Sequence, residues 1–159
     1  MQKITPSLWF DMNAEEAVNF YLSVFRDSKI LSLNRYPENI PGVGGKVMTI
    51  SFILNGQEFV ALNGGPHYSF TPAVSFVVNC GSQEEVDYYW EKLLEGGAAE
   101  QCGWLRDKFG LSWQIVPAEL IQILGSDNRE GAQRVSAALL KMIKLDLNVL
   151  RDAFGGARG

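Results

Sequence analysis

An internal repeat dominates this sequence: a strand, a capped helix and further strands occur twice in the same order. A single offset aligns Asn13 with Ser82, Glu15-Glu16 with Glu84-Glu85, and Phe20-Tyr21 with Tyr89-Trp90. The first pair has the residue types that cap helices, and the last pairs lie on the apolar stripe of each predicted helix. A chain that repeats one supersecondary unit in this way is predicted to fold as two similar modules.

The first half predicts a strand, a helix and three more strands. Residues 4–10 form an apolar run typical of a buried strand, and Asn13 with Glu16 has the spacing of a capping box that opens a helix. Further strands are expected at 30–36, 46–54 and 58–63. The last two are joined through Asn55-Gly56, a strong hairpin signal.

The second half repeats this order and then adds helices. Strands are expected at 73–78, 99–105 and 111–116, with a helix that starts at the capping box 82–85. Residues 117–124 predict a short helix, 127–130 cap a longer one, and Asp146 caps a final one. The longer helix is expected to direct Ala132, Val135, Leu139, Met142 and Ile143 inward.

The composition is that of a globular protein and disfavours two classes of partner. The chain has 159 residues, of which 47% are hydrophobic and 20% charged. Its net charge of −4 argues against binding to nucleic acid or to an anionic membrane surface. No apolar run is long enough to span a bilayer, the N-terminus has no signal-peptide pattern, and two cysteines suit a reducing compartment. We therefore expect a cytoplasmic protein.

Four parts of the sequence resemble the PhnB-like proteins. They are LWFD at 8–11 with AEEA at 14–17, FVALNGGP at 59–66, QCGWLRDKFG at 101–110 and SWQIVP at 112–117. This group is often labelled demethylubiquinone methyltransferase. It belongs to the vicinal oxygen chelate superfamily, with glyoxalase I, extradiol dioxygenases and bleomycin-resistance proteins. The resemblance covers nearly the whole chain.

The resemblance implies an α+β fold of two tandem βαβββ modules, the glyoxalase-like fold, with extra C-terminal helices. It also implies a small-molecule pocket inside the curled sheets, and a homodimer in which the partner often completes the cavity. We expect a single domain over 1–159, with module one at about 1–66, module two at about 72–117 and a helical extension at about 118–154. The strand and helix order predicted from the residues agrees with this fold.

Enzymes of the superfamily usually hold one divalent metal ion, with a His in each module's first strand and a Glu in each last strand. The resemblance maps these positions to Pro6 and Ser75, and to Val60 and Gln114. Moving the first-strand positions by one residue gives Thr5, Ser7, Val74 or Phe76. None of these is His or a carboxylate, and one neutral amide does not hold a metal ion. We therefore expect no metal site and no cofactor.

The candidate ligand-binding residues lie on strands and in the loops beside them. Gln114 and Ser112 share one face of the last strand, and an amide that faces a cleft orients a ligand by hydrogen bonding. The alternative for Gln114 is a structural amide bonded to a neighbouring strand. Trp9 and Trp104 supply aromatic surface for an apolar cavity, although aromatic residues on strands more often belong to the core.

Three polar or reactive side chains complete the candidate set. His67, the only histidine, either overhangs the pocket or is a solvated loop residue between the modules. Cys102 lies near Arg106 and Lys108, whose charges lower the pKa of a thiol that they face; otherwise it is a small buried hydrophobe. Asn63 ends a strand before two glycines, where it contacts a ligand or caps a turn.

Three classes of function stay open on the sequence, and no catalytic residue is assigned. The favoured class is a metal-free protein that binds an apolar or partly aromatic small molecule between the modules. The second is an enzyme with a relocated site at His67, Cys102 or a dimer interface. The third is a dimeric interaction module without a pocket. Methyl transfer is disfavoured, because the glycine-rich stretch 42–45 does not join a strand to a helix as a nucleotide-binding turn does.

Overall fold

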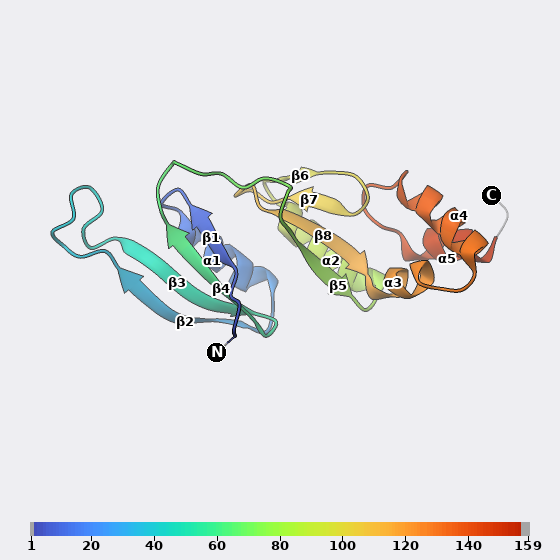
Figure 1. The fold of residues 1–159 in the computed structure, drawn as a ribbon, viewed down its shortest axis with the longest axis horizontal. Helices are drawn as coiled ribbons and strands as arrows, with labels where there is room; N and C mark the ends of the chain where they lie inside the picture. The colour runs from blue at the N-terminus through green and yellow to red at the C-terminus, as the bar shows by residue number, and fades with distance from the viewer. Residues whose placement is uncertain (1, 157–159) are drawn as a thin grey trace. The chain divides into compact units, whose positions relative to one another are not determined.

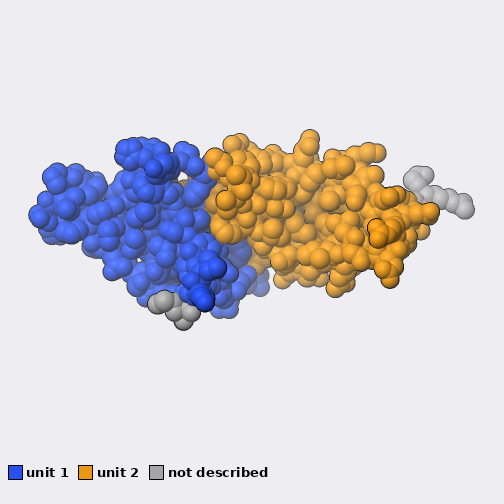
Figure 2. Space-filling view, viewed as in Figure 1, with its two compact units in different colours: residues 1–70 blue, residues 71–159 orange. Residues whose placement is uncertain are grey.

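The computed structural model describes residues 2–156, which form two compact units that divide between Phe70 and Thr71 (Figure 2). Unit 1 contains β1 (Ser7–Phe10), α1 (Ala14–Val24), β2 (Ser28–Arg35), β3 (Val47–Leu54) and β4 (Gln57–Asn63). Unit 2 contains β5 (Ser75–Cys80), α2 (Gln83–Leu94), β6 (Ala98–Ala99), β7 (Trp104–Arg106), β8 (Ser112–Pro117), α3 (Ala118–Leu124), α4 (Arg129–Leu139) and α5 (Leu147–Gly155) (Figure 1).

Both units have the same sheet topology. The strand order is β1-β4-β3-β2 in unit 1 and β5-β8-β7-β6 in unit 2. In each unit the first strand pairs parallel with the last one, and the remaining pairs are antiparallel. The predicted α+β fold of two βαβββ modules followed by C-terminal helices is therefore confirmed.

Each long helix packs on one face of the sheet in its own unit. α1 buries Ala14, Ala17, Val18, Tyr21 and Val24 and contacts β3 and β4. α2 buries Val86, Trp90 and Leu93 and contacts β5, β7 and β8. Both buried sets follow the three- and four-residue spacing of an amphipathic helix, so the apolar stripes of the sequence are the faces that cover the sheets.

The two helix starts differ from each other. The Ser82 hydroxyl accepts a bond from the Glu85 N–H at 3.2 Å, as predicted, while the Glu85 carboxylate accepts from the Gly81 N–H at 2.6 Å. Asn13 precedes α1, but its side chain makes no capping bond. Asn63 does this instead, accepting from the Ala14 N–H at 2.9 Å. The predicted capping box of the first helix is therefore wrong, because a side chain from β4 satisfies the helix start.

The predicted hairpin between β3 and β4 is present. Asn55 and Gly56 have φ values of 47° and 82°, the left-handed conformations that a two-residue type I′ turn requires. The turn sets the register in which Leu54 pairs with Gln57 and Phe52 with Phe59. A single pair of turn residues thus fixes which side chains of both strands face α1.

The strand expected at 99–105 is broken into β6 and β7. Cys102 and Gly103 interrupt it with φ values of 59° and 82°. Their N–H groups donate outside the sheet, to the carbonyls of Met142 and Ile143, each at 2.8 Å. Because these two N–H groups are bonded to the C-terminal residues, they are not available for strand pairing, and the strand is interrupted.

The C-terminal helices form a small core of their own within unit 2, beyond the end of β8 (Figure 1). This core consists of Leu120, Ile123, Val135, Leu145 and Leu150. Asn128 and Asp146 cap α4 and α5, as predicted, by accepting from the N–H groups of Gly131 and Val149. Ile143 is 55% exposed rather than inward, because α4 ends at Leu139 and the chain turns before it.

No helix among the described residues is both long enough and apolar enough to cross a membrane.

A buried carboxylate holds the turn that leads into β8. Asp107 is 3% exposed. Its Oδ1 accepts from the N–H groups of Phe109 and Leu111 at 2.8 and 3.0 Å, and its Oδ2 accepts from the Trp113 indole N–H at 2.9 Å. One side chain therefore fixes both the turn and the first residues of the strand that carries Gln114.

We expect Asp107→Ala to lower the free energy of unfolding by about 3 kcal/mol, because it leaves several buried donors without an acceptor. Urea denaturation followed by circular dichroism measures the loss. Asp152→Ala, an exposed aspartate on α5, is the matched control and is expected to change stability by less than about 0.5 kcal/mol. Equal losses in the two variants would contradict the role assigned to Asp107.

Candidate functional site

Three of the predicted ligand residues of the second module, Gln114, Ser112 and Trp104, lie on the side of its sheet that faces away from α2. We call this side the distal face and define it by Ser75, Val77, Trp104, Arg106, Ser112 and Gln114. Val77, Gln114 and Trp104 are register partners across β5, β8 and β7, and so are Ser75, Ser112 and Arg106. Paired residues project from the same side of a sheet, so two short rows of side chains cross this face.

Gln114 is the residue around which the distal face is organised. Its Nε2 donates a hydrogen bond to the Ser75 hydroxyl at 2.9 Å, and the side chain stays partly exposed. Trp104 and Val77 flank it on the neighbouring strands. The result is an amide with remaining hydrogen-bonding capacity between two apolar side chains, which is the arrangement that orients a mainly apolar ligand.

Ser112 and Arg106 supply the polar part of the second row. Ser112 is completely buried, and its hydroxyl has no hydrogen-bond partner among the described residues. Such a group costs about 1–3 kcal/mol, so it is unusual in a folded core. The Arg106 side chain is half exposed and lies 4.0 Å from Glu100, a distance at which the ion pair contributes little.

The side chains at this face are suited to binding rather than to covalent chemistry. Within residues 2–156, neither Ser75 nor Ser112 is hydrogen-bonded to a histidine or a carboxylate. A serine nucleophile needs such a base to remove its proton. The distal face therefore provides hydrogen bonds, apolar contact and one cation, but no activated nucleophile.

The four positions mapped to metal ligands meet in pairs. In unit 2 they are Ser75 and Gln114, which are bonded to each other. In unit 1 they are Pro6 and Val60, linked by a bond from the Val60 N–H to the Pro6 carbonyl at 2.9 Å. Two hydrocarbon side chains, a hydroxyl and an amide do not fit a divalent ion. Among the described residues, no group of three or more His, Cys, Asp or Glu side chains is arranged to hold a metal ion.

Trp9 and Asn63 both make internal contacts in unit 1. The Trp9 indole N–H donates to the Gly65 carbonyl at 2.9 Å, and its ring meets the ring of Tyr68 edge-on at 4.9 Å. Asn63 is buried, accepts from the Ala14 N–H and donates to the Val47 carbonyl at 3.0 Å. These bonds favour a structural role for both residues, so their contact with a ligand stays a prediction.

The remaining two candidates, His67 and Cys102, lie in two different loops rather than on one strand or helix. His67 is exposed in the loop that follows β4, in unit 1. Cys102 is partly buried in the turn between β6 and β7, two residues before Trp104. The distal face thus unites Gln114, Ser112 and Trp104 from the predicted set, and leaves His67, Cys102, Asn63 and Trp9 apart from it.

Val77 and Arg106 are residues of the distal face that the sequence did not identify as ligand contacts. Val77 lies in an apolar run in which neither face is distinguished from the other. Arg106 was considered only as a neighbour of Cys102. The signal that finds them is the register of β5, β7 and β8, because it places each of them opposite a polar residue of β8.

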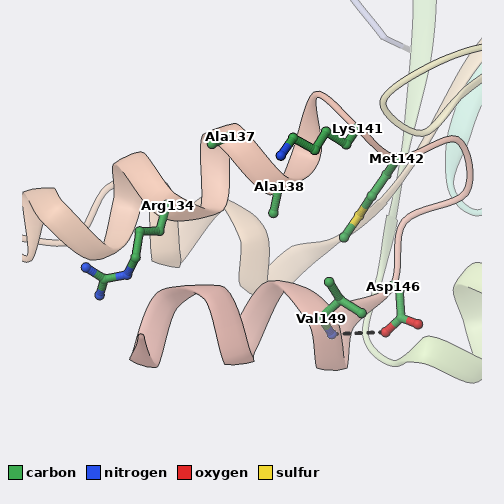
Figure 3. Close-up of a pocket in the computed structure, with 7 residues that line it drawn as sticks. All are labelled: Arg134, Ala137, Ala138, Lys141, Met142, Asp146 and Val149. Atoms are coloured by element: carbon green, nitrogen blue, oxygen red, sulfur yellow. Dashed lines mark hydrogen bonds between the residues drawn. The ribbon is translucent and has the colours of Figure 1, made fainter. Parts of the chain in front are cut away.

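A concave surface lies between α4 and α5. It has a volume of about 540 Å³ and is lined by Arg134, Ala137, Ala138, Lys141, Met142, Asp146 and Val149. Figure 3 shows Ala138, Met142 and Val149 turned toward the space between the helices. None of the predicted ligand residues lines this groove, so it is separate from the distal face.

A family model and a solved structure that match this chain carry the same name. The family model described as 3-demethylubiquinone-9 3-methyltransferase matches residues 2–116. The PhnB protein of Bacillus cereus, which carries the same methyltransferase name, is 44% identical with a TM-score of 0.68, covering 74% of this chain and 100% of its own. No protein of curated function matches the chain.

Two more distant structures show the fold alone. A glyoxylase/bleomycin resistance protein/dioxygenase domain from Frankia is 17% identical with a TM-score of 0.50, covering 74% of this chain and 98% of its own. The fosfomycin resistance protein FosX of Listeria monocytogenes, in complex with Mn(II) and sulfate, is 15% identical with a TM-score of 0.53, covering 79% and 98%.

The two cysteines differ in environment, and this difference is measurable. Cys80 is 1% exposed, and burial, reinforced by the charge of Glu85, raises the pKa of its thiol to about 12. Cys102 is partly buried. We expect iodoacetamide to alkylate Cys102 in the native protein at about pH 8 and to leave Cys80 unmodified, because the thiolate is the reactive form. Mass spectrometry of Cys80→Ser and Cys102→Ser variants assigns each site.

The buried thiol of Cys80 makes the free energy of unfolding depend on pH in the alkaline range. The folded pKa of Cys80 exceeds the ordinary value of 9.0, so its contribution is fully present below about pH 9 and is lost as the pH rises toward about 12. Cys80→Ser is expected to flatten the loss of stability in this window. An unchanged alkaline profile in Cys80→Ser would contradict the burial of a neutral thiol.

Proposed function

Because this chain belongs to the 3-demethylubiquinone-9 3-methyltransferase family, the PhnB-like proteins of the vicinal oxygen chelate superfamily, we propose that it is a small-molecule binding protein. The ligand is an apolar or partly aromatic molecule with at least one hydrogen-bonding group. It lies against the distal face, with Gln114 as the orienting contact. The observation that carries this proposal is the position of Gln114, partly exposed between Trp104 and Val77 and bonded to Ser75.

Each part of the distal face has a role in this proposal. Trp104 and Val77 supply apolar surface, which provides most of the binding free energy for a ligand of this kind. Gln114 and Ser75 supply directional hydrogen bonds. Ser112 is a buried hydroxyl without a partner among the described residues, and Arg106 adds a positive charge beside it. A small number of separate polar groups within a mainly apolar surface is typical of ligand sites.

We propose that binding proceeds without a metal ion. The residues at the four positions where related enzymes hold a metal are Pro6, Val60, Ser75 and Gln114. The bond between Ser75 and Gln114 uses one donor and one acceptor of that set, and the Pro6 and Val60 side chains are hydrocarbon. These residues suit contact with an organic ligand directly rather than through an ion.

The methyltransferase name of the family receives no support from the glycine-rich stretch 42–45. It lies between β2 and β3, with Gly42 and Gly45 in left-handed conformations. A nucleotide-binding glycine turn instead joins a strand to the start of a helix. Binding is therefore the activity that we assign, ahead of methyl transfer.

Assembly and location are part of the same proposal. We infer a cytoplasmic homodimer with a ligand pocket inside the curled sheets. The support for it is the family resemblance, together with the acidic net charge of −4 and the two unpaired cysteines.

The first experiment is a native mass spectrum of the protein purified without chelator. A dimer with a co-purified organic mass is the expected result, and that mass identifies the ligand. A divalent metal ion bound in stoichiometric amount would overturn the metal-free proposal. If no organic mass is retained, 1-naphthol serves as an aromatic probe with one hydroxyl group, titrated by calorimetry.

We expect Gln114→Ala and Trp104→Ala each to weaken ligand or 1-naphthol binding by about tenfold, equivalent to about 1.4 kcal/mol, with little change in melting temperature. Gln122→Ala, an exposed glutamine on α3, is the matched control and should bind normally. Global unfolding of both site variants, or normal binding by both, would contradict the proposed role of the distal face.

A further inference from the structure

The C-terminal extension contacts the turn that precedes Trp104 through backbone hydrogen bonds and one buried side chain. Residues 142–147, which comprise part of the segment between α4 and α5 and the first residue of α5, lie along the β6–β7 turn and the start of α2. The N–H groups of Cys102 and Gly103 donate to the carbonyls of Met142 and Ile143, each at 2.8 Å. The family model ends at residue 116, so these contacts come from a part of the chain that the model does not cover.

The turn that receives these contacts is strained. Cys102 has a φ of 59°, a left-handed conformation that costs a residue with a side chain roughly 1–2 kcal/mol. A residue keeps such a conformation only where its surroundings hold it. The two bonds that the Cys102 and Gly103 N–H groups donate to Met142 and Ile143 supply that restraint.

Leu145 continues the contact into the sheet. It is completely buried, and its side chain lies so close to Gly103 that a Cβ there would approach Leu145 Cγ to 2.9 Å and the Ile115 carbonyl oxygen to 3.0 Å. The Gly103 carbonyl in turn accepts from the Ile115 N–H at 2.8 Å. Gly103 is thus held between Leu145 and β8, one residue before Trp104 and opposite the neighbour of Gln114.

The same segment is fixed to α2 from the other side. The Gln83 side chain donates to the Leu145 carbonyl at 3.0 Å and accepts from the Leu147 N–H at 2.7 Å. Lys144 pairs with Asp87 at 2.8 Å, and this contact lowers the pKa of the Asp87 carboxyl. Leu145 therefore has a fixed position relative to α2. Its contact with Gly103 in turn holds the β6–β7 turn in a fixed position relative to that helix.

We propose that Leu145 is a positioning residue for the ligand site: it sets the place of Trp104 and Gln114 on the distal face by holding Gly103 against β8. In this proposal the C-terminal extension holds the residues of the ligand site in position without contacting the ligand. The proposal rests on the proposed function only in naming Trp104 and Gln114 as ligand contacts.

Nuclear magnetic resonance of the ligand-free protein tests the positioning directly. In Leu145→Ala we expect the Trp104 indole and Gln114 side-chain amide signals to shift, and the Cys102 and Gly103 amides to exchange with solvent about tenfold faster or more. The Trp9 indole signal, from unit 1, should stay in place. Leu145→Met, which conserves volume, should restore the wild-type spectrum.

Leu140→Ala is the matched control, since Leu140 lies in the same extension but is 70% exposed. If Leu145→Ala does not fold, Gln83→Ala removes the attachment to α2 without a cavity and should shift the same signals in the same direction. Signals of Trp104 and Gln114 that move no more in Leu145→Ala or Gln83→Ala than in Leu140→Ala would overturn the proposal.

The titration with 1-naphthol separates this proposal from the proposed function. Shifted signals together with weaker 1-naphthol binding in Leu145→Ala support both. If the signals shift but neither the wild type nor any variant binds 1-naphthol, the positioning role is supported. The same result counts against the distal face as a ligand site.

Discussion

The parallel pairing of β5 with β8 determines the candidate site. The two strands are separated along the chain by α2 and two further strands, yet Ser75 lies opposite Ser112 and Val77 opposite Gln114. A parallel pair needs a crossover connection, which here is completed by α2 on one face of the sheet. That helix occupies the side of Trp113 and Ile115, so the alternate residues of β8 are left for the distal face. The same pairing of β1 with β4 brings Pro6 and Val60 together in unit 1.

The same pairing accounts for where the four positions mapped to metal ligands lie in the two sheets. The topology brings together the four positions in pairs whatever residues occupy them. In this chain the unit 2 pair is an amide bonded to a hydroxyl, and the unit 1 pair is hydrocarbon. The topology therefore fixes which positions meet, while the side chains at those positions decide their chemistry. Trp104 and Val77, as register neighbours of Gln114, turn that location into an apolar surface with one amide at its centre.

The C-terminal extension, a segment outside the repeat, makes contacts with a turn inside it. The sequence pattern predicts a single strand over 99–105. Instead, the N–H groups of Cys102 and Gly103 donate to the carbonyls of Met142 and Ile143, and Leu145 lies against the position where a Gly103 side chain would project. The buried backbone amides of the turn need acceptors, and the extension supplies them. The local cost of the left-handed turn is offset by contacts that arise only when the extension is in place.

The sequence by itself determined the order of elements, the repeat, the hairpin at Asn55-Gly56 and the caps at Ser82, Asn128 and Asp146, because each of these depends on residues within a few positions of one another. It also grouped Ser112 with Gln114, since alternation along one strand is local. It did not find the capping of α1 by Asn63, the break in the strand at Cys102, the exposure of Ile143 or the membership of Val77 and Arg106 in the distal face. Only the tertiary structure decided these, because each depends on a partner from another strand or helix, and backbone and side-chain hydrogen bonds go to whichever partner the packed chain brings within reach.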